Sequence, residues 1–245
     1  MRLIVVMLAA LSACGPERTS TPRDTIAPLA PAGAPASAFP APARPVADIV
    51  TDTWSSEDTR DRAGEADTVM TLLSVRGGMR VADVGAGSGY YTVRMSRRVG
   101  PRGGVIAQDI IPEYLRRLRT RVATEKLSNV TLALGEPHDP RLPAASVELA
   151  MLVHMYHEVE QPYAFLHNLR ASIAPGGRVA VVDLDRPTNR HGTPPALLRC
   201  EFAALGYAQT EFFDLPNGSG YLAVFTPRGP APEPAAVRAC PTEPT

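Results

Sequence analysis

Short apolar runs alternate with longer amphipathic stretches from residue 57 to residue 205. Short runs rich in Val, Ile and Leu are typical of buried strands, and apolar positions three or four apart are typical of helices. The pattern predicts five strands, at residues 79–84, 105–108, 130–134, 147–153 and 178–182. It predicts helices at residues 57–74, 90–99, 112–127, 162–173 and 195–205.

Strands that alternate with helices usually form a parallel sheet with helices on both faces. Two further apolar runs, at residues 210–215 and 221–225, are separated only by the turn-rich residues 216–220. This short connection predicts an antiparallel hairpin. The predicted fold class is therefore α/β, a Rossmann-like doubly wound sheet of seven strands with a terminal antiparallel hairpin.

Proline is concentrated at the two ends of the chain. Of its 25 prolines, 8 lie in residues 15–47 and 6 lie in residues 227–245. Stretches rich in Pro and Ala with few large apolar side chains favour extended conformations over packing. We expect one globular domain over residues 48–226, between a disordered linker at 15–47 and a disordered tail at 227–245.

The first fourteen residues have the order of a secretory signal. A positive charge at Arg2 precedes the apolar run from Leu3 to Leu11, which is far shorter than the roughly 20 residues that span a bilayer. The tetrapeptide ending in Cys14 resembles the lipobox of bacterial lipoproteins. The resemblance implies a signal peptide at 1–14, lipidation of Cys14, and a protein anchored by lipid in the bacterial cell envelope, facing the periplasm or exterior. The alternative is a cytoplasmic protein whose N-terminus is not a working signal.

Charge and cysteine content narrow the expectations further. With 25 basic and 25 acidic residues the net charge is zero, so we expect neither nucleic acid nor a membrane surface as partner, apart from the lipid anchor. Cys200 and Cys240 are too few for a disulfide framework. One bridge between them is an alternative, but we expect Cys200 to pack as a small apolar residue and Cys240 to be a free thiol. No pattern in the sequence sets an oligomeric state.

A glycine-rich loop follows the first predicted strand. Gly85, Gly87 and Gly89 come directly after Asp83, at the strand end where open α/β sheets bind ligands. A dinucleotide-binding turn needs a glycine at the position of Tyr90, which argues against a nicotinamide cofactor. A carboxylate at Asp83 suits an ammonium group.

A second acidic residue completes the pattern. Asp109 ends the second strand, twenty residues past the loop, where a carboxylate accepts hydrogen bonds from a ribose. A ligand with both an amino-acid end and a ribose is S-adenosylmethionine. We therefore expect Asp83, the three glycines of the loop and Asp109 to bind this cofactor.

These motifs, together with Pro175-Gly176-Gly177 before the fifth strand, resemble the class I S-adenosylmethionine-dependent methyltransferases over residues 57–226. The closest likeness is to small-molecule enzymes of the ubiquinone and arsenite methyltransferase type. The resemblance implies the strand order 3-2-1-4-5-7-6. It also implies that the loop after the third strand binds the adenine. That loop leaves Glu136 or Asp139 for the exocyclic amine, and we expect Asp139.

Histidines follow the fourth strand, at the ligand-binding edge. We predict that His157 is catalytic and takes a proton from the acceptor, the alternative being that it only caps the next helix. In the same alternative, His154 only lines the cofactor pocket. The spacing of His154 and His157 is not that of a zinc-binding helix, so no metal is predicted.

The predicted function is transfer of a methyl group from S-adenosylmethionine to a small-molecule acceptor. A non-catalytic binding module with the same fold is one alternative, because an exported protein reaches a compartment not expected to hold this cofactor. A nicotinamide-dependent reductase is the second alternative. Trp54, just before the first helix, is a candidate for a lid over the site.

Overall fold

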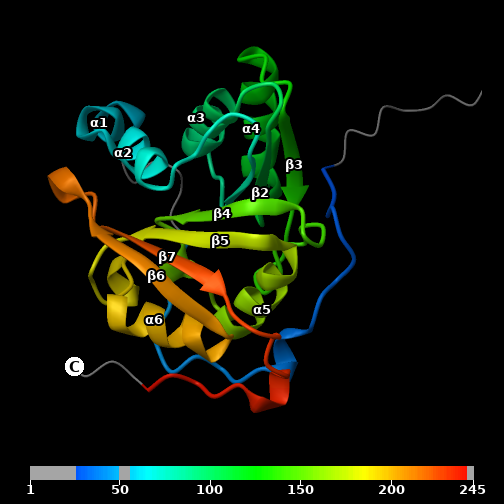
Figure 1. Cartoon of the computed structure of the whole chain (residues 1–245), viewed down its shortest axis with the longest axis vertical. Helices are drawn as coiled ribbons and strands as arrows, with labels where there is room; N and C mark the ends of the chain where they lie inside the picture. The colour runs from blue at the N-terminus through cyan, green and yellow to red at the C-terminus, as the bar shows by residue number, and fades with distance from the viewer. Residues whose placement is uncertain (1–25, 50–55, 242–245) are drawn as a thin grey trace, which may run out of the picture.

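A seven-stranded sheet forms the centre of the molecule in the computed structural model, which describes residues 26–49 and 56–241 (Figure 1). The strand order is β3-β2-β1-β4-β5-β7-β6. Strand β7 runs antiparallel to its neighbours β5 and β6, and the other pairs are parallel. The predicted fold class, strand order and terminal hairpin are confirmed. The strands are β1 (Arg80–Val84), β2 (Gly104–Asp109), β3 (Val130–Leu134), β4 (Val147–Val153), β5 (Ile173–Asp183), β6 (Tyr207–Asp214) and β7 (Tyr221–Pro227).

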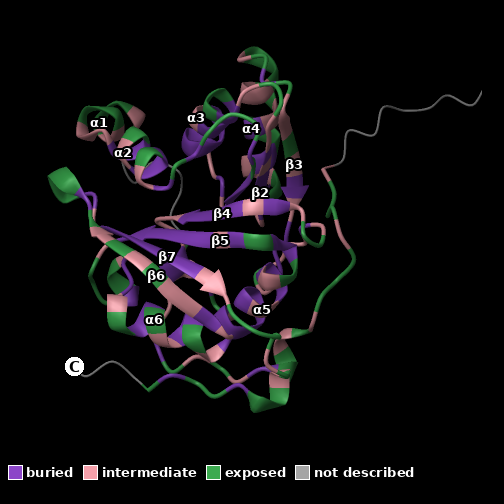
Figure 2. Cartoon of the chain, viewed as in Figure 1, coloured by how far each residue is buried: buried purple, intermediate pink, exposed green. Residues whose placement is uncertain are grey.

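Helices cover both faces of the sheet, and the central strands are almost wholly buried between them (Figure 2). Successive residues of a strand point to opposite faces. Val81 accordingly packs with the side that carries α2 and α3, and Ala82 with the side that carries α5 and α6. The helices are α1 (Glu57–Ala63), α2 (Glu65–Leu72), α3 (Tyr90–Val99), α4 (Pro112–Thr124), α5 (Pro162–Ser172) and α6 (Pro195–Ala204). None of the helices in the described part of the chain is long and apolar enough to cross a membrane.

The helix predicted at residues 57–74 is two helices. Gly64, between α1 and α2, has φ of 68°, a left-handed conformation that ends α1 and that glycine adopts without a steric penalty. The change of direction brings the Arg60 guanidinium within 2.6 Å of the Glu65 carboxylate. The break therefore creates a charged pair beside the ligand-binding edge.

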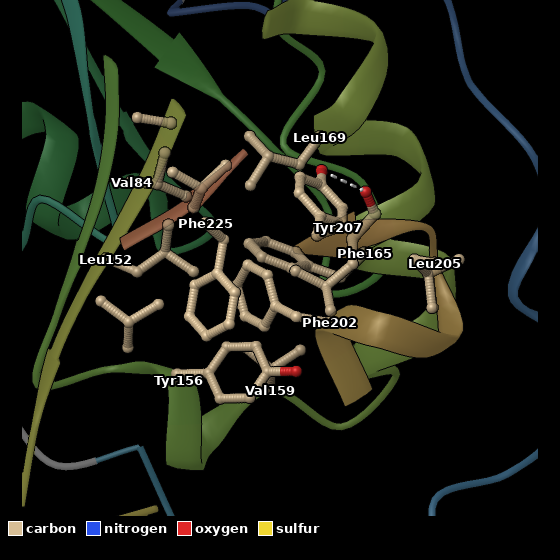
Figure 3. Close-up of a cluster of buried hydrophobic side chains, with 14 of the residues drawn as sticks. Val84, Leu152, Tyr156, Val159, Phe165, Leu169, Phe202, Leu205, Tyr207 and Phe225 are labelled. Atoms are coloured by element: carbon tan, nitrogen blue, oxygen red, sulfur yellow. Dashed lines mark hydrogen bonds between the residues drawn. The ribbon is translucent and has the colours of Figure 1, made fainter. Parts of the chain in front are cut away.

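Aromatic side chains fill the core between the sheet and α5 and α6 (Figure 3). The rings of Phe202 and Phe225 stack with centroids 3.9 Å apart, and Tyr207 and Tyr156 pack on Phe202 at 5.2 and 5.6 Å. The hydroxyls of both tyrosines have hydrogen-bond partners. Tyr207 donates to the carbonyl of Leu166, and Tyr156 donates to the carboxylate of Glu201. Tyr156 belongs to the 3₁₀ turn η2 (Tyr156–Glu158), so this core also fixes the segment that follows β4.

The prediction of a disordered linker at 15–47 is wrong for its described part. Residues 26–49 form an extended segment, here called the strap, that runs beside α5 (Figure 1). The strap includes one 3₁₀ turn, η1 (Ala36–Ala38), and buries Phe39 to 9% exposure. The Pro- and Ala-rich composition gives the strap no core of its own, but its backbone polar groups find partners on the domain. Cys14 and the predicted signal at 1–14 lie outside the described residues.

Backbone groups of the strap bond to side chains of the domain. The amide of Gly33 donates to Asp139 at 2.8 Å, and the amide of Ala34 donates to the side chain of Asn168 at 2.9 Å. Asn168 returns a bond to the carbonyl of Ala34 at 3.0 Å. These bonds satisfy the extended backbone in the way that a neighbouring strand would.

The C-terminal tail is also packed rather than disordered. Cys240 forms a disulfide with Cys200 of α6, so the expectation of two reduced thiols is wrong and the alternative of one bridge holds. The amide of Cys240 donates to the hydroxyl of Tyr163 at 2.7 Å. Arg170 donates to the carbonyls of Arg228 and Gly229. The described tail residues 228–241, with the 3₁₀ turn η5 (Pro234–Ala236), therefore lie on α5 and α6.

A buried ion pair connects the strap to the domain. The Arg44 guanidinium lies 2.9 Å from the carboxylate of Glu201 in α6, and both side chains are 1% exposed. Glu201 also accepts a hydrogen bond from Tyr156 at 2.8 Å, and Arg44 donates to the carbonyl of Val159. The strap, α6 and η2 thus meet at one charged centre.

Replacing Arg44 by leucine should be strongly destabilising. Removing one partner of a buried pair leaves an uncompensated charge, so Arg44→Leu should lower the free energy of unfolding by about 3–5 kcal/mol. The control is Arg97→Leu, because Arg97 is 66% exposed and pairs with Glu125 at the surface. That change should cost about 1 kcal/mol or less. Urea denaturation, with the Cys200–Cys240 disulfide intact, measures the free energy of unfolding of both variants. Equal decreases in the two variants would mean that the strap does not contribute to the stability of the fold.

Candidate active site

A cavity of about 340 Å³ opens at the carboxyl ends of β1, β2, β4 and β5. Strands β1 and β4 are neighbours in the sheet, and the order reverses between them, which is where open α/β sheets bind ligands. Five predicted site residues line the cavity. They are Asp83, Gly85, Gly87, Asp109 and His157.

The glycine loop joins β1 to α3 in a shape that other residues cannot adopt. Gly85 and Gly89 have φ of 73° and 85°. A Cβ on Gly89 would lie 2.3 Å from the side chain of Leu118 in α4, and one on Gly85 would lie 2.9 Å from Met155. Gly85 borders the cavity, whereas Gly89 caps α3 and sits against α4. The loop is therefore packed closely on one side and leaves its backbone exposed to a ligand on the other.

Asp83 is buried at the floor of the cavity, with 3% exposure. Its carboxylate accepts a hydrogen bond from Thr92 at 2.5 Å. Burial raises the pKa of Asp83 to about 6, and the charge of Asp109 adds to the shift, although Thr92 and Arg60 oppose it. Burial destabilises the ionised form of this carboxylate, so a cationic ligand beside it would stabilise the charge strongly.

Asp109, at the end of β2, holds the loop from the other side. Its Oδ2 accepts from the amide of Gly87 and its Oδ1 from the amide of Ile111, at 2.8 and 2.9 Å. Asp109 also lines the cavity, on the same side as the glycine loop that it holds. The position agrees with the predicted ribose contact.

The structure does not place Asp139 at the cavity, contrary to the expected adenine contact. Its two oxygens accept from the amides of Gly33 in the strap and Arg141, both at 2.8 Å. Glu136, the alternative, lines the cavity with Pro137. Local sequence could not decide between Glu136 and Asp139, because the partner of Asp139 is a strap residue more than a hundred positions away.

A polar network beside the glycine loop was not predicted. Arg60 lies over the ring of Tyr90 at 4.0 Å and donates to Glu65, which in turn accepts from the hydroxyl of Tyr91. The Nε2 of His154 lies 3.4 Å from Glu65. Burial alone would raise the pKa of Glu65, but the hydrogen bond with His154 and the charge of Arg60 lower it to about 2.

Both Tyr90 and Tyr91 pack toward α1 and α2, since the hydroxyl of Tyr90 donates to Asp61 at 2.9 Å and that of Tyr91 to Glu65 at 3.1 Å. His154 lines the cavity. Trp54, the candidate lid residue, lies outside the described residues.

His157 is held by a second carboxylate. Its Nδ1 lies 3.0 and 3.1 Å from the two oxygens of Asp183 at the end of β5, and its side chain is 3% exposed. Asp183 also accepts from the hydroxyl of Thr193 at 2.7 Å and from the amide of Leu184. These bonds fix the orientation of the imidazole and direct its Nε2 away from Asp183.

Two further titratable residues lie beside His157. One ring nitrogen each of His157 and His191 and one carboxylate oxygen of Glu158 lie within 4.8 Å of one another. His154 points elsewhere, toward Glu65. The spacing of His154 and His157 predicted no metal site, whereas the fold brings His157 together with His191, from the loop after β5.

The strand order β3-β2-β1-β4-β5-β7-β6, with helices on both faces, defines a Rossmann-like doubly wound fold with a terminal antiparallel hairpin. Residues 81–177 match the family model described as Methyltransferase domain. A solved structure of an S-adenosylmethionine-dependent methyltransferase from Aquifex aeolicus superimposes with a TM-score of 0.62 at 22% identity, covering 68% of this chain and 90% of that one. At this identity the likeness establishes the shared fold.

Two curated relatives are each similar over about half of the chain. A ubiquinone/menaquinone biosynthesis C-methyltransferase (UbiE) of Pseudomonas putida is 27% identical over 120 residues, 49% of this chain and 47% of the relative. A protein-L-isoaspartate O-methyltransferase of Methanothrix thermoacetophila is 29% identical over 110 residues, 45% of this chain and 50% of the relative. The chain thus spans about half the length of the curated relatives it matches.

The raised pKa of Asp83 predicts a pH-dependent stability. Its folded-state pKa of about 6 exceeds the unfolded value of about 3.9, so the native state binds more protons between these values. Stability from this group is present below pH 4 and is lost as pH rises through 6, by about 3 kcal/mol. Asp83→Asn keeps an oxygen for Thr92 and removes the charge, so the variant should gain stability relative to wild type as pH rises from 4 to 7.

Urea denaturation of both proteins at pH 4, 5, 6 and 7 measures this gain. Asp214→Asn, a change at an exposed strand end, is the matched control for loss of a carboxylate. A constant difference between wild type and Asp83→Asn over this range would contradict the prediction.

Proposed function

We propose that the chain transfers a methyl group from S-adenosylmethionine to a small-molecule acceptor. The observation that carries the proposal is the placement of Asp83, the glycine loop and Asp109 around one cavity at the switch point of the sheet. The match of residues 81–177 to a methyltransferase domain and the naming of both curated relatives as methyltransferases support it.

The residues present suit each part of the cofactor. Asp83 is a buried carboxylate for the ammonium group, and Asp109 is an acceptor for the ribose hydroxyls. Glu136, with Ile110 and Ile111 among the lining residues, takes the adenine role in place of Asp139. When bound, the cofactor supplies an activated methyl group on a sulfonium. The chain therefore has to bind, align and exclude water rather than form a covalent intermediate.

A nicotinamide-dependent reductase fits these contacts poorly. At the position where such a turn requires glycine, this chain has Tyr90. The Cζ atoms of Arg60 and Arg94 lie 4.0 and 3.7 Å from the centroid of its ring. The glycine at this position of a dinucleotide-binding turn lets the helix pack closely on the strand, and a tyrosine does not. A non-catalytic binding module is the remaining alternative, and the experiments below separate it from an enzyme.

His157 is the catalytic residue of the proposal. It stands at the end of the cavity formed by the segments after β4 and β5, and Asp183 fixes its tautomer and orientation. Without a metal, the Nε2 of His157 accepts the proton of a hydroxyl, thiol or amine acceptor as the methyl group is transferred. Asp183 then stabilises the imidazolium.

Binding of S-adenosylhomocysteine to the full chain tests the cofactor site. Asp109→Ala should raise the dissociation constant roughly tenfold to 150-fold, equivalent to about 1.5–3 kcal/mol for hydrogen bonds to a charged group. Calorimetric titration measures it, with Asp214→Ala as a control that removes an exposed carboxylate. Absence of binding to wild type would refute the cofactor assignment, and binding without turnover would favour the binding module.

Replacing His157 should affect turnover and spare cofactor binding. His157→Ala should lower kcat by about a hundredfold to ten-thousandfold, the usual effect of a positioned proton acceptor. The dissociation constant for S-adenosylhomocysteine should change less than threefold, because the proposed cofactor residues lie on or just after β1, β2 and β3, whereas His157 follows β4. A rate within a factor of ten of wild type would reduce His157 to a structural residue.

We also propose that the protein resides in the bacterial cell envelope, anchored through a lipid on Cys14. The signal-like residues 1–14 suggest export, and the Cys200–Cys240 disulfide supports it, because such bridges persist mainly in oxidising compartments. In this setting the strap begins soon after the anchor, so the domain would lie close to the membrane surface.

Processing of the N-terminus tests the location. Protein purified from membranes of its native host should lack residues 1–13 and carry lipid on Cys14, as intact mass spectrometry would reveal. Cys14→Ser should leave the chain without lipid and move it from the membrane to the soluble fraction. A wild-type protein that retains Met1 would end the lipoprotein proposal.

A further inference from the structure

Three metal-ligating side chains converge at the cavity. His157 and Glu158 belong to η2, after β4, and His191 closes the 3₁₀ turn η3 (Thr188–Arg190), after β5. Their ligand atoms lie within 4.8 Å of one another, and the two imidazole rings are edge to face with centroids 5.5 Å apart. All three residues line the cavity.

His157 has the outer contact that metal-binding histidines have. Such a histidine typically donates its second ring nitrogen to a carboxylate, which fixes the tautomer and raises the basicity of the ligating nitrogen. The Nδ1 of His157 lies 3.0 Å from Asp183, and Asp183 is itself held by Thr193 and Leu184. Nε2 is therefore the nitrogen presented to an ion.

The strap joins the two segments that carry these ligands. The amide of Ala47 donates to the carbonyl of His157 at 3.1 Å, and Thr188 donates to the carbonyl of Pro45 at 2.6 Å. Both segments are thus fixed to the same short stretch of chain. Ligands held in this way lose little freedom when an ion binds.

We propose that His157, Glu158 and His191 bind a zinc ion. Two imidazoles and one carboxylate form one of the ligand sets of catalytic zinc, in which a fourth position stays open for substrate. Ca²⁺ and Mg²⁺ prefer oxygen ligands, so the two nitrogens disfavour them. Zinc bonds of about 2.0–2.2 Å place tetrahedral ligand atoms roughly 3.3 Å apart, so small side-chain rotations from the present spacing complete the site.

The zinc ion would activate the methyl acceptor, a consequence that rests on the proposed function. A hydroxyl or thiol acceptor that binds the open position loses its proton to solvent, because zinc lowers the pKa of a bound protic group. The resulting anion attacks the methyl carbon. The carbon–sulfur bond breaks with its electron pair on sulfur, which yields the methylated acceptor and S-adenosylhomocysteine. With zinc bound, His157 acts as a ligand and does not accept the proton.

Zinc binding to the full-length chain, freed of metal by a chelator and carrying no histidine tag, tests the proposal. Calorimetric titration with Zn²⁺ should give one site per chain. Glu158→Gln and His191→Asn should each weaken binding about 100-fold or more, because each removes one of three ligands. Asparagine tolerates the left-handed backbone of residue 191, where φ is 55°. Asp183→Asn should weaken binding about 10- to 100-fold through the orientation of His157.

His167→Ala is the matched control. His167 packs on Phe39 of the strap at a centroid distance of 5.1 Å and is not among the residues that line the cavity. This variant should bind zinc as wild type does. Failure of wild type to bind zinc, or unchanged binding in both Glu158→Gln and His191→Asn, would overturn the proposal.

The same proteins titrated with S-adenosylhomocysteine keep the two proposals apart. Zinc binding without binding of S-adenosylhomocysteine would support the metal site and refute the cofactor site. Binding of S-adenosylhomocysteine with no zinc site would leave His157 as a metal-free base. Circular dichroism of each variant checks that the fold is retained.

Discussion

The buried pair of Arg44 and Glu201 determines how the acceptor end of the cavity is built. Two charges removed from water are stable only when every partner is in place. Here the partners come from three segments, because Glu201 also accepts from Tyr156 and Arg44 donates to Val159. Tyr156 and Val159 flank His157 and Glu158 in sequence. The position of the segment that carries His157 and Glu158 is thus tied to this ion pair.

The site has two halves with different physical origins. The cofactor half combines the backbone of the glycine loop, held between Asp109 and the α4 side chain of Leu118, with the carboxylates of Asp83 and Asp109. The acceptor half is made of side chains, in which the neighbouring residues His154 and His157 are each oriented by a different carboxylate, Glu65 and Asp183. Changes in one half should therefore leave the other largely intact.

The sequence was sufficient for the fold and for most of the cofactor half. Periodicity identifies the strands, and residues of one loop such as Asp83 and Gly85 are placed by a local turn, so their positions follow from nearby sequence. The partners of Asp139 and His157 could not be read in this way, since Gly33 and Asp183 approach them only through tertiary structure. The proline-rich composition of the two ends led to a wrong prediction of disorder for their described residues. A proline-rich segment lacks its own core, but that does not prevent it from packing on a core formed by other residues.

The strap also has a consequence for the order of folding. Arg44 and its partner Glu201 are 157 positions apart, and Gly33 is 106 positions from Asp139. Contacts between residues so distant in sequence form slowly, because the closure of a long loop precedes any gain from the contact. During synthesis the strap leaves the ribosome first, yet it stays without its charged partner until α6 has emerged. The acceptor end is therefore completed late, when most of the chain has been made.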